Sequence, residues 1–334
     1  MRDPIDAFRA TVRTELGAAP EHIEPGQLHR FATNGKHGDT SGWCKLFADG
    51  RAGMFGDWRT GACETWTAAD TGRLCRQRRA ELAQEVARAR AEREQAQRRQ
   101  WAEHAQRIAR MLGQCVALVP GDPVTLYLKR RGFAGLWPLP ACLRLHPRLS
   151  YWDGDKRIGT FPAMVAPLTA PDGRIVALHR TYLTADGRKA DVPSSKKLTA
   201  TAGPLAGACI ALHRPAAGVL GVAEGIETAL AAWLASGVPT VAAYSAANVK
   251  AYQWPRDVRR LVVFADPGDA GQSAAQALQA RAAGAGLRCE VLTPSTPGAD
   301  WCDVWAAREG AALDRIAQGV ADAFEPASMQ GGAA

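Results

Sequence analysis

The sequence predicts an α/β protein: a parallel sheet covered by helices, preceded by a basic α+β region, a charged helix and a small β module. Three observations predict this order. Near-continuous apolar strands alternate with amphipathic helices over residues 217–306, which is typical of a parallel sheet buried on both faces. Asp-Gly turns separate apolar strands between residues 116 and 215, and a charged, proline-free stretch covers residues 72–113.

The 334 residues suffice for several compact parts. We expect a small N-terminal β-rich module at 1–70, a charged helical linker at 71–115, a basic α+β subdomain at 116–215, a parallel-sheet domain at 216–325 and a disordered tail at 326–334.

The N-terminal module begins with a helix in residues 1–20, where apolar residues recur at helical spacing. Residues 21–69 then place turn signals between short aromatic runs, which predicts antiparallel strands. Trp43 and Trp58 lie among basic residues that include Arg59. These rings could stack on bases while the cations contact phosphates, or they could form the core of the small sheet. Both interpretations stay open.

Residues 72–113 alternate Arg with Glu and Gln, and their apolar positions are mostly Ala until Trp101. This pattern predicts a semi-rigid helical spacer whose charges face solvent or follow a phosphate backbone. After it, residues 122–133 fit a short helix, and residues 143–218 fit hairpins of a mixed sheet rich in Arg and Lys.

The composition favours a polyanionic partner, because the formal net charge is +8. The eight cysteines are scattered singly without a Cys-x-x-Cys pair, so no zinc site is expected. No apolar run is long enough to span a membrane and the start does not resemble a secretory signal, so the expected location is the cytoplasm.

Acidic residues follow the strands of the predicted parallel sheet. Glu224 ends the first strand and Asp266 ends the third; Asp269, Asp300 and Asp303 come shortly after strands. Carboxyl ends of parallel strands share one edge, where converging acids would repel one another unless a cation lies among them. Oxygen ligands of this kind suit Mg²⁺ or Mn²⁺. For Asp269 and Asp300, a role as helix N-caps is the alternative.

The segments GVAEGIETALAA, VVFADPGDAGQSAA and GADWCDV together resemble the Toprim domain, the metal-binding fold of topoisomerases and primases. Upstream, VALHRTYLTADGRKADVPSSKKL is similar to the basic subdomain that precedes Toprim in DnaG-type primases, and the arrangement looks most like Toprim proteins of plasmids, phages and integrative elements. The resemblance implies Glu224 and Asp266 as catalytic and metal-binding residues, with Asp300 and Asp303 as tail acids.

By the same analogy, Arg180, Lys196 and Lys197 would contact a nucleoside triphosphate or a template; an exposed basic hairpin is the alternative. The sequence departs from the family at its Asp-x-Asp pair, where Gly268 takes the second position and Asp269 follows. This departure puts catalysis in doubt.

The resemblance implies a primase that makes short RNA primers from ribonucleoside triphosphates on single-stranded DNA, with a replicative helicase as a further partner. A Toprim nuclease and a non-catalytic module that binds single strands or recruits a helicase are the alternatives. The chain has neither a Cys-rich zinc ribbon nor a Gly-x-x-x-x-Gly-Lys-[Ser/Thr] loop.

Overall fold

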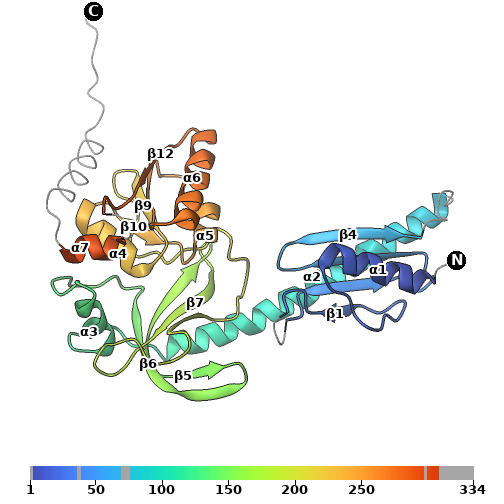
Figure 1. Ribbon diagram of the computed structural model, residues 1–334, viewed down its shortest axis with the longest axis horizontal. Coiled ribbons are helices and arrows are strands. Elements are labelled where there is room, and N and C mark those ends of the chain that lie inside the picture. The colour runs from blue at the N-terminus through green and yellow to red at the C-terminus, as the bar shows by residue number, and fades with distance from the viewer. Residues whose placement is uncertain (1–2, 36–38, 69–75, 297–298, 308–334) are drawn as a thin grey trace, which may run out of the picture. The chain divides into compact units, whose positions relative to one another are not determined.

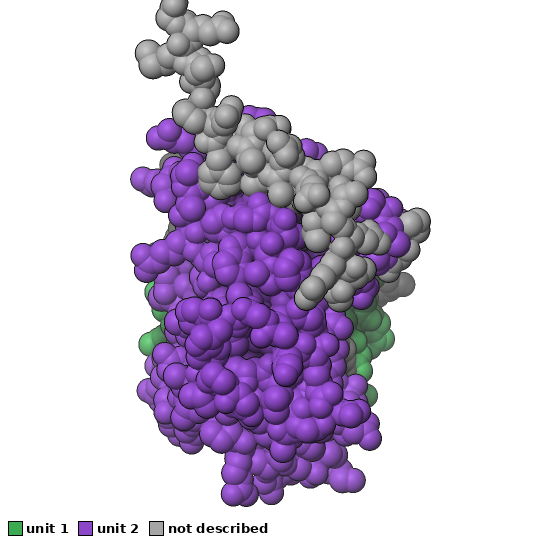
Figure 2. Space-filling model, turned by 90° about the vertical axis from the view of Figure 1, so that its left-hand side faces the viewer, with its two compact units in different colours: residues 1–98 green, residues 99–334 purple. Residues whose placement is uncertain are grey.

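The structure, a computed structural model, describes residues 3–35, 39–68, 76–296 and 299–307 (Figure 1). The chain forms two compact units, residues 1–98 and 99–334, which Figure 2 distinguishes by colour. The predicted disordered tail at 326–334 lies outside the described residues, and the five-part domain division stays a prediction.

The first unit contains a four-stranded antiparallel sheet in the order β1-β2-β3-β4. Phe8 and Val12 on one face of α1 are fully buried and pack in one core cluster with strand residues. The helical spacing of apolar residues in this segment therefore reflects the packing of α1 against the sheet. The elements are α1 (Pro4–Leu16), β1 (His29–Phe31), β2 (Gly42–Leu46), β3 (Ala52–Asp57) and β4 (Ala62–Thr67).

The charged stretch is a helix, α2 (Arg76–Gly113). Between residues 90 and 107 its side chains are mostly exposed, as the alternating charges predict. Among the side chains of α2 that the structure describes, Ile108 is the first to be buried, and it joins a core cluster of the second unit.

The second unit begins with a four-stranded sheet in the order β5-β6-β7-β8. All its strand pairs are antiparallel, so the expectation of a mixed sheet was wrong. Gly154, Gly173 and Gly187 of the three Asp-Gly turns have φ of 57°, 84° and 78°, which glycine adopts without steric cost. The elements are α3 (Pro123–Arg130), β5 (Arg144–Asp153), β6 (Lys156–Thr169), β7 (Ile175–Tyr182) and β8 (Lys196–Leu198).

The second sheet of this unit is parallel throughout, in the order β10-β9-β11-β12, which confirms the predicted fold class. The chain leaves β9 for β10 on one side and then returns to β11 on the other. The carboxyl ends of β9 and β11 therefore flank a topological switch point, where open α/β sheets bind ligands. The elements are β9 (Val219–Ala223), α4 (Ile226–Ser236), β10 (Thr240–Ala242), α5 (Ala246–Ala251), β11 (Arg260–Phe264), α6 (Asp269–Gly284), β12 (Arg288–Leu292) and α7 (Trp301–Ala307).

Both faces of the parallel sheet are buried. Leu220 and Val222 of β9 belong to one core cluster with residues of α5 and α6, whereas Val219 and Ala223 belong to another with residues of α4 and α7. The latter cluster also contains residues of α3 and of the antiparallel sheet, so the two sheets of the second unit share a core. In the described part of the chain, no helix is both long and apolar enough to cross a membrane.

Candidate active site

A cavity of about 330 Å³ opens at the carboxyl edge of the parallel sheet. Glu224 follows β9, Asp266 follows β11 and Asp300 precedes α7, and all three line this cavity. The cavity thus lies at the switch point, and it brings together three of the five acids that the sequence singled out.

The surroundings of Asp266 disfavour its charged form. Burial, Glu224 and Asp300 together raise the pKa of Asp266 to about 6, although the Thr228 hydroxyl donates a hydrogen bond to it. Its Oδ1 atom is buried and has no hydrogen-bond partner within the described part of the protein. A buried carboxylate oxygen without a donor is a candidate ligand for a cation.

Glu224 is half-buried at the same edge. Burial raises its pKa, while the backbone N–H of Ala246 and the charge of Lys196 act in the opposite direction. The N–H of Ala246 belongs to the first turn of α5, so this short helix helps to fix the carboxylate.

Glu227 is a site residue that the sequence analysis missed. Its carboxylate accepts hydrogen bonds from the hydroxyl of Tyr127 (2.5 Å) on α3 and from Nζ of Lys196 (2.9 Å) on β8. Its side chain is only 7% exposed. Burial alone would raise its pKa, but Lys196 and the Tyr127 hydroxyl lower it to about 2, so Glu227 is ionised. It therefore holds the ammonium group of Lys196 at the cavity.

Asp300 and Asp303 form a reciprocal cap at the start of α7. The N–H of Asp303 donates to Oδ1 of Asp300 (2.8 Å), and the N–H of Asp300 donates to Oδ2 of Asp303 (3.1 Å). Asp300 also forms an ion pair with Arg131 (3.9 Å). Asp303 is exposed and does not line the cavity, so its contacts are those of a capping residue.

Asp269 is the first residue of α6 and is exposed. It does not line the cavity with Asp266. The shift by one residue in Asp266-Pro-Gly-Asp269 therefore leaves the position beside Asp266 without a second carboxylate from this loop.

The donor set fits a divalent cation that keeps other ligands. Within the described ranges, no three His, Cys, Asp or Glu side chains are grouped closely enough to hold a metal ion by themselves. Mg²⁺ is usually bound by one or two carboxylates together with water and substrate phosphates, so it does not need such a cage. Glu224 and Asp266, with its unpartnered oxygen, satisfy this requirement.

The two adjacent lysines of β8 lie on opposite faces of the antiparallel sheet, as period 2 requires. Lys196 lines the acidic cavity. Nζ of Lys197 donates instead to the carbonyl of Trp152 (2.5 Å). Arg180, the cross-strand partner of Lys197, lines a second cavity of about 440 Å³ with Arg107. The structure thus separates basic residues that the sequence had grouped.

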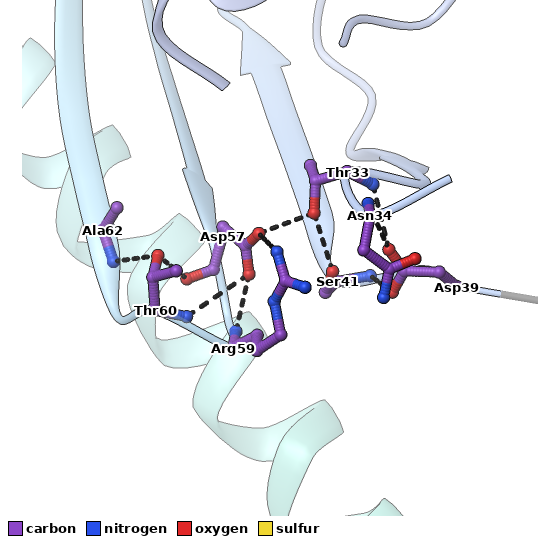
Figure 3. Close-up of polar contacts among 8 residues, drawn as sticks. All are labelled: Thr33, Asn34, Asp39, Ser41, Asp57, Arg59, Thr60 and Ala62. Carbon is purple, nitrogen blue, oxygen red and sulfur yellow. Dashed lines mark hydrogen bonds and ion pairs between the residues drawn. The ribbon is translucent and has the colours of Figure 1, made fainter. Parts of the chain in front are cut away.

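In the first unit, Trp43 is 3% exposed and belongs to a core cluster, which favours the core role that the sequence left open. Trp58 is half-buried, and the guanidinium of Arg30 lies 3.7 Å from the centre of its ring. The backbone N–H of Arg59 donates to Asp57 (2.7 Å), whose other oxygen accepts from Thr33 (2.6 Å). Figure 3 shows this polar cluster around the carboxylate of Asp57. The Arg59 side chain remains about half exposed.

Two aromatic residues also line the acidic cavity and were missed by the sequence analysis. His179 is buried; burial and Lys196 lower its pKa to about 4, so the ring is neutral at pH 7. Tyr244 meets it edge-on, with 6.0 Å between the ring centres. No local motif marks either residue. An aromatic residue two positions after the end of a strand in a parallel sheet is the only available signal, for Tyr244.

Comparison with family models matches residues 219–312 to the Toprim domain. Glu224, Asp266 and Asp300 all lie within the matched residues. Residues 102–211 match a domain of unknown function (DUF7146), which covers α3 and the antiparallel sheet. A search of curated proteins finds no match.

Several solved structures with similarity to the chain are primase domains. A primase domain from Pseudomonas aeruginosa is 19% identical, with a TM-score of 0.36; the match covers 53% of this chain and 58% of that one. The RNA polymerase domain of Mycobacterium tuberculosis primase DnaG is 20% identical, with a TM-score of 0.33 and coverage of 51% and 59%. The zinc-binding and RNA polymerase domains of Aquifex aeolicus primase are 15% identical, with a TM-score of 0.40 and coverage of 96% and 86%. The chain therefore spans less than two thirds of the first two structures.

Proposed function

We propose that the chain is a primase-like nucleotidyltransferase that synthesises short RNA primers on single-stranded DNA, in the cytoplasm, during replication of a mobile element. The observation that carries the proposal is the cavity of the Toprim domain, where Glu224 and Asp266 face Lys196 and Arg131. Acids that attract a divalent cation and bases that attract phosphate are the two requirements of phosphoryl transfer.

Glu224 and Asp266 would hold Mg²⁺ or Mn²⁺, which would orient the triphosphate and neutralise developing charge. Lys196 and Arg131 would neutralise the phosphate oxygens. The primer 3′-hydroxyl would attack the α-phosphorus of the ribonucleotide, and diphosphate would leave. Glu227 supports this arrangement because it holds Lys196 at the cavity. Asp303 and Asp269 have no part in this proposed metal site; they lie in the first turns of α7 and α6.

The template would be bound by cationic and aromatic groups outside the acidic cavity. Arg180 and Lys197 lie beside the half-exposed Trp152, a combination that suits phosphates and stacked bases. The net charge of +8 supports a nucleic-acid partner. A replicative helicase as a further partner belongs to this proposal as well.

The decisive experiment incubates the protein with single-stranded DNA, labelled ribonucleotides and Mg²⁺ or Mn²⁺. We expect labelled oligonucleotides that disappear in Glu224→Gln and Asp266→Asn. Asp303→Asn is the matched control, because it removes an acid of the same edge that does not line the cavity, and it should retain activity within a few fold. Equal product from wild type and both cavity variants would contradict the assignment.

One observation favours a second candidate, a module that binds single strands or recruits a helicase without catalysis. Asp269 does not line the cavity, so its loop supplies one carboxylate only. The same incubation separates the candidates: DNA binding without oligonucleotides supports the module, and shortening of the DNA supports a Toprim nuclease.

A further inference from the structure

Tyr244 has an unusual backbone conformation at the edge of the acidic cavity. Its φ is 75°, in the left-handed region that bulky side chains rarely adopt. In the part of the chain that the structure describes, Ala217 is the one other non-glycine residue with positive φ. Such outliers persist where the surroundings enforce them, and they cluster at functional sites.

The backbone of Tyr244 explains the turn but not the tyrosine. Its N–H donates to the carbonyl of Glu224 (2.8 Å), and the next residue, Ser245, caps α5. Neither contact uses the side chain of Tyr244, and glycine would adopt the same backbone conformation without strain. The tyrosine side chain therefore adds conformational strain at this position without contributing to the turn.

The ring of Tyr244 gives the cavity an apolar, aromatic part. Tyr244, His179 and Ile210 line the same cavity as the acids and Lys196. His179 supports the tyrosine ring edge-on, at an angle of 67° between the ring planes. A ligand that fits both parts is charged at one end and flat and weakly polar at the other, which describes a nucleotide.

We propose that Tyr244 binds the base of the nucleoside triphosphate whose phosphates lie beside Lys196 and the bound cation. The inference rests on the proposed function and adds a base-binding residue to it. Stacking on an aromatic ring tolerates every base, because each has a π face. A primer-synthesising enzyme must accept four nucleotides at one site, and a stacking residue meets that requirement.

The test compares Tyr244→Gly, Tyr244→Ala and Tyr244→Phe in the full chain by calorimetric titration with ATP, CTP or inorganic tripolyphosphate in Mg²⁺. Loss of the ring in the Gly and Ala variants should weaken ATP and CTP binding about tenfold. The Phe variant should bind within about threefold of wild type, since it retains the ring. Tripolyphosphate, which has no base, should bind all four proteins equally.

Thermal unfolding of the same variants tests the strain. Tyr244→Gly and Tyr244→Ala lose the same ring, but Ala keeps the conformational strain, so Gly should melt about 2 °C higher. If a truncated variant unfolds, Tyr244→Trp replaces it: ATP should quench the new indole fluorescence and tripolyphosphate should not.

Unchanged ATP affinity in the folded Gly and Ala variants, or absence of quenching in the Trp variant, would overturn the base-binding role and leave the proposed function intact. Equal weakening of tripolyphosphate binding would also overturn it. A wild-type protein that binds neither ATP nor tripolyphosphate would overturn the proposed function and this inference together.

Discussion

Asp266 carries a charge that the folded chain holds at a cost. The raised pKa, about 6, means that the folded state binds a proton more tightly than the unfolded state, whose carboxyl titrates near pH 4. Stability from this group is therefore greatest below pH 4 and falls as the pH rises toward 6. This pH dependence of stability is the one expected of the proposed metal ligand, whose charge destabilises the folded state when no metal is bound.

Asp266→Asn should accordingly raise the melting temperature by about 2–4 °C at pH 7.5 in the presence of chelator, and the gain should vanish near pH 4. Calorimetric scans of both proteins from pH 4 to 8 check this. Asp303→Asn should show no such gain, because that acid does not line the cavity. A gain that persists at pH 4 would indicate a cause other than the charge.

Glu227 has the opposite sign, because its pKa is lowered to about 2. Its contribution to stability is present above about pH 4.5 and is lost as the pH falls toward 2. Glu227→Ala should lower the free energy of unfolding at pH 7 by about 3 kcal/mol, since it leaves the Tyr127 hydroxyl without its acceptor. Urea titration of both proteins at pH 7 and pH 3 measures this loss of stability at each pH. A loss that is the same at the two pH values would contradict the role of the Glu227 charge.

The site could be predicted from the sequence only where chain position decides geometry. Glu224 comes directly after β9 and Asp266 two residues after the end of β11, so parallel pairing of the two strands brings them to one edge. Tyr127 and Glu227 are 100 residues apart and meet through core packing, which no local pattern encodes. The left-handed conformation of Tyr244 was likewise invisible, because the sequence shows no glycine there.

At the scale of elements, α6 packs closely against the loop that carries Asp266. A Cβ atom on Gly271 would lie 2.6 Å from the carbonyl oxygen of Asp266, so any side chain there must displace the loop or the helix. Gly284, at the other end of α6, has no atom within 4 Å of such a Cβ. The two glycines of one helix thus have different roles.

Gly271→Ala should therefore cost about 1–3 kcal/mol of stability and reduce primer synthesis, because it moves Asp266. Gly284→Ala, the matched control, should be neutral or stabilising by up to about 1 kcal/mol, since alanine favours the helix. Denaturant unfolding and the primer assay measure both effects. Similar free energies of unfolding for the two variants would contradict this prediction, because they would mean that the loop moves away from the new Cβ atom without loss of stability.

Strand predictions succeeded where burial dictates composition and failed where pairing direction is needed. The apolar runs of β9 and β11 fit a sheet buried on both faces, and Leu220 and Val219 indeed belong to different core clusters. The antiparallel direction of β7 and β8 could not be read in the same way, because the burial of a strand does not fix the direction in which its neighbour runs. The alternation of β8 also places Lys196 and Lys197 on opposite faces, a separation that a prediction by motif overlooks.

At the scale of the whole molecule, the excess of 41 Lys and Arg over 33 Asp and Glu predicts binding to nucleic acid that depends on salt. If Arg107, Arg180 and Lys197 contact three phosphates of a single strand, affinity should fall about 20-fold between 50 and 200 mM salt. Fluorescence anisotropy with a labelled single strand measures the slope. Arg180→Gln should lower it by about one contact, and binding that is independent of salt would contradict the assignment of these residues.

The position of Asp300 near the end of the described chain determines when the acidic edge is completed during translation. Trp301 is 1% exposed, and its indole N–H donates to the carbonyl of Ala265, which precedes Asp266. A nascent chain that has left the ribosome as far as β12 therefore has its strands but lacks both the third acid and the indole that secures the second. Translation must proceed through α7 before this acidic edge is complete, so a ribosome stalled earlier would hold a chain without its full candidate site.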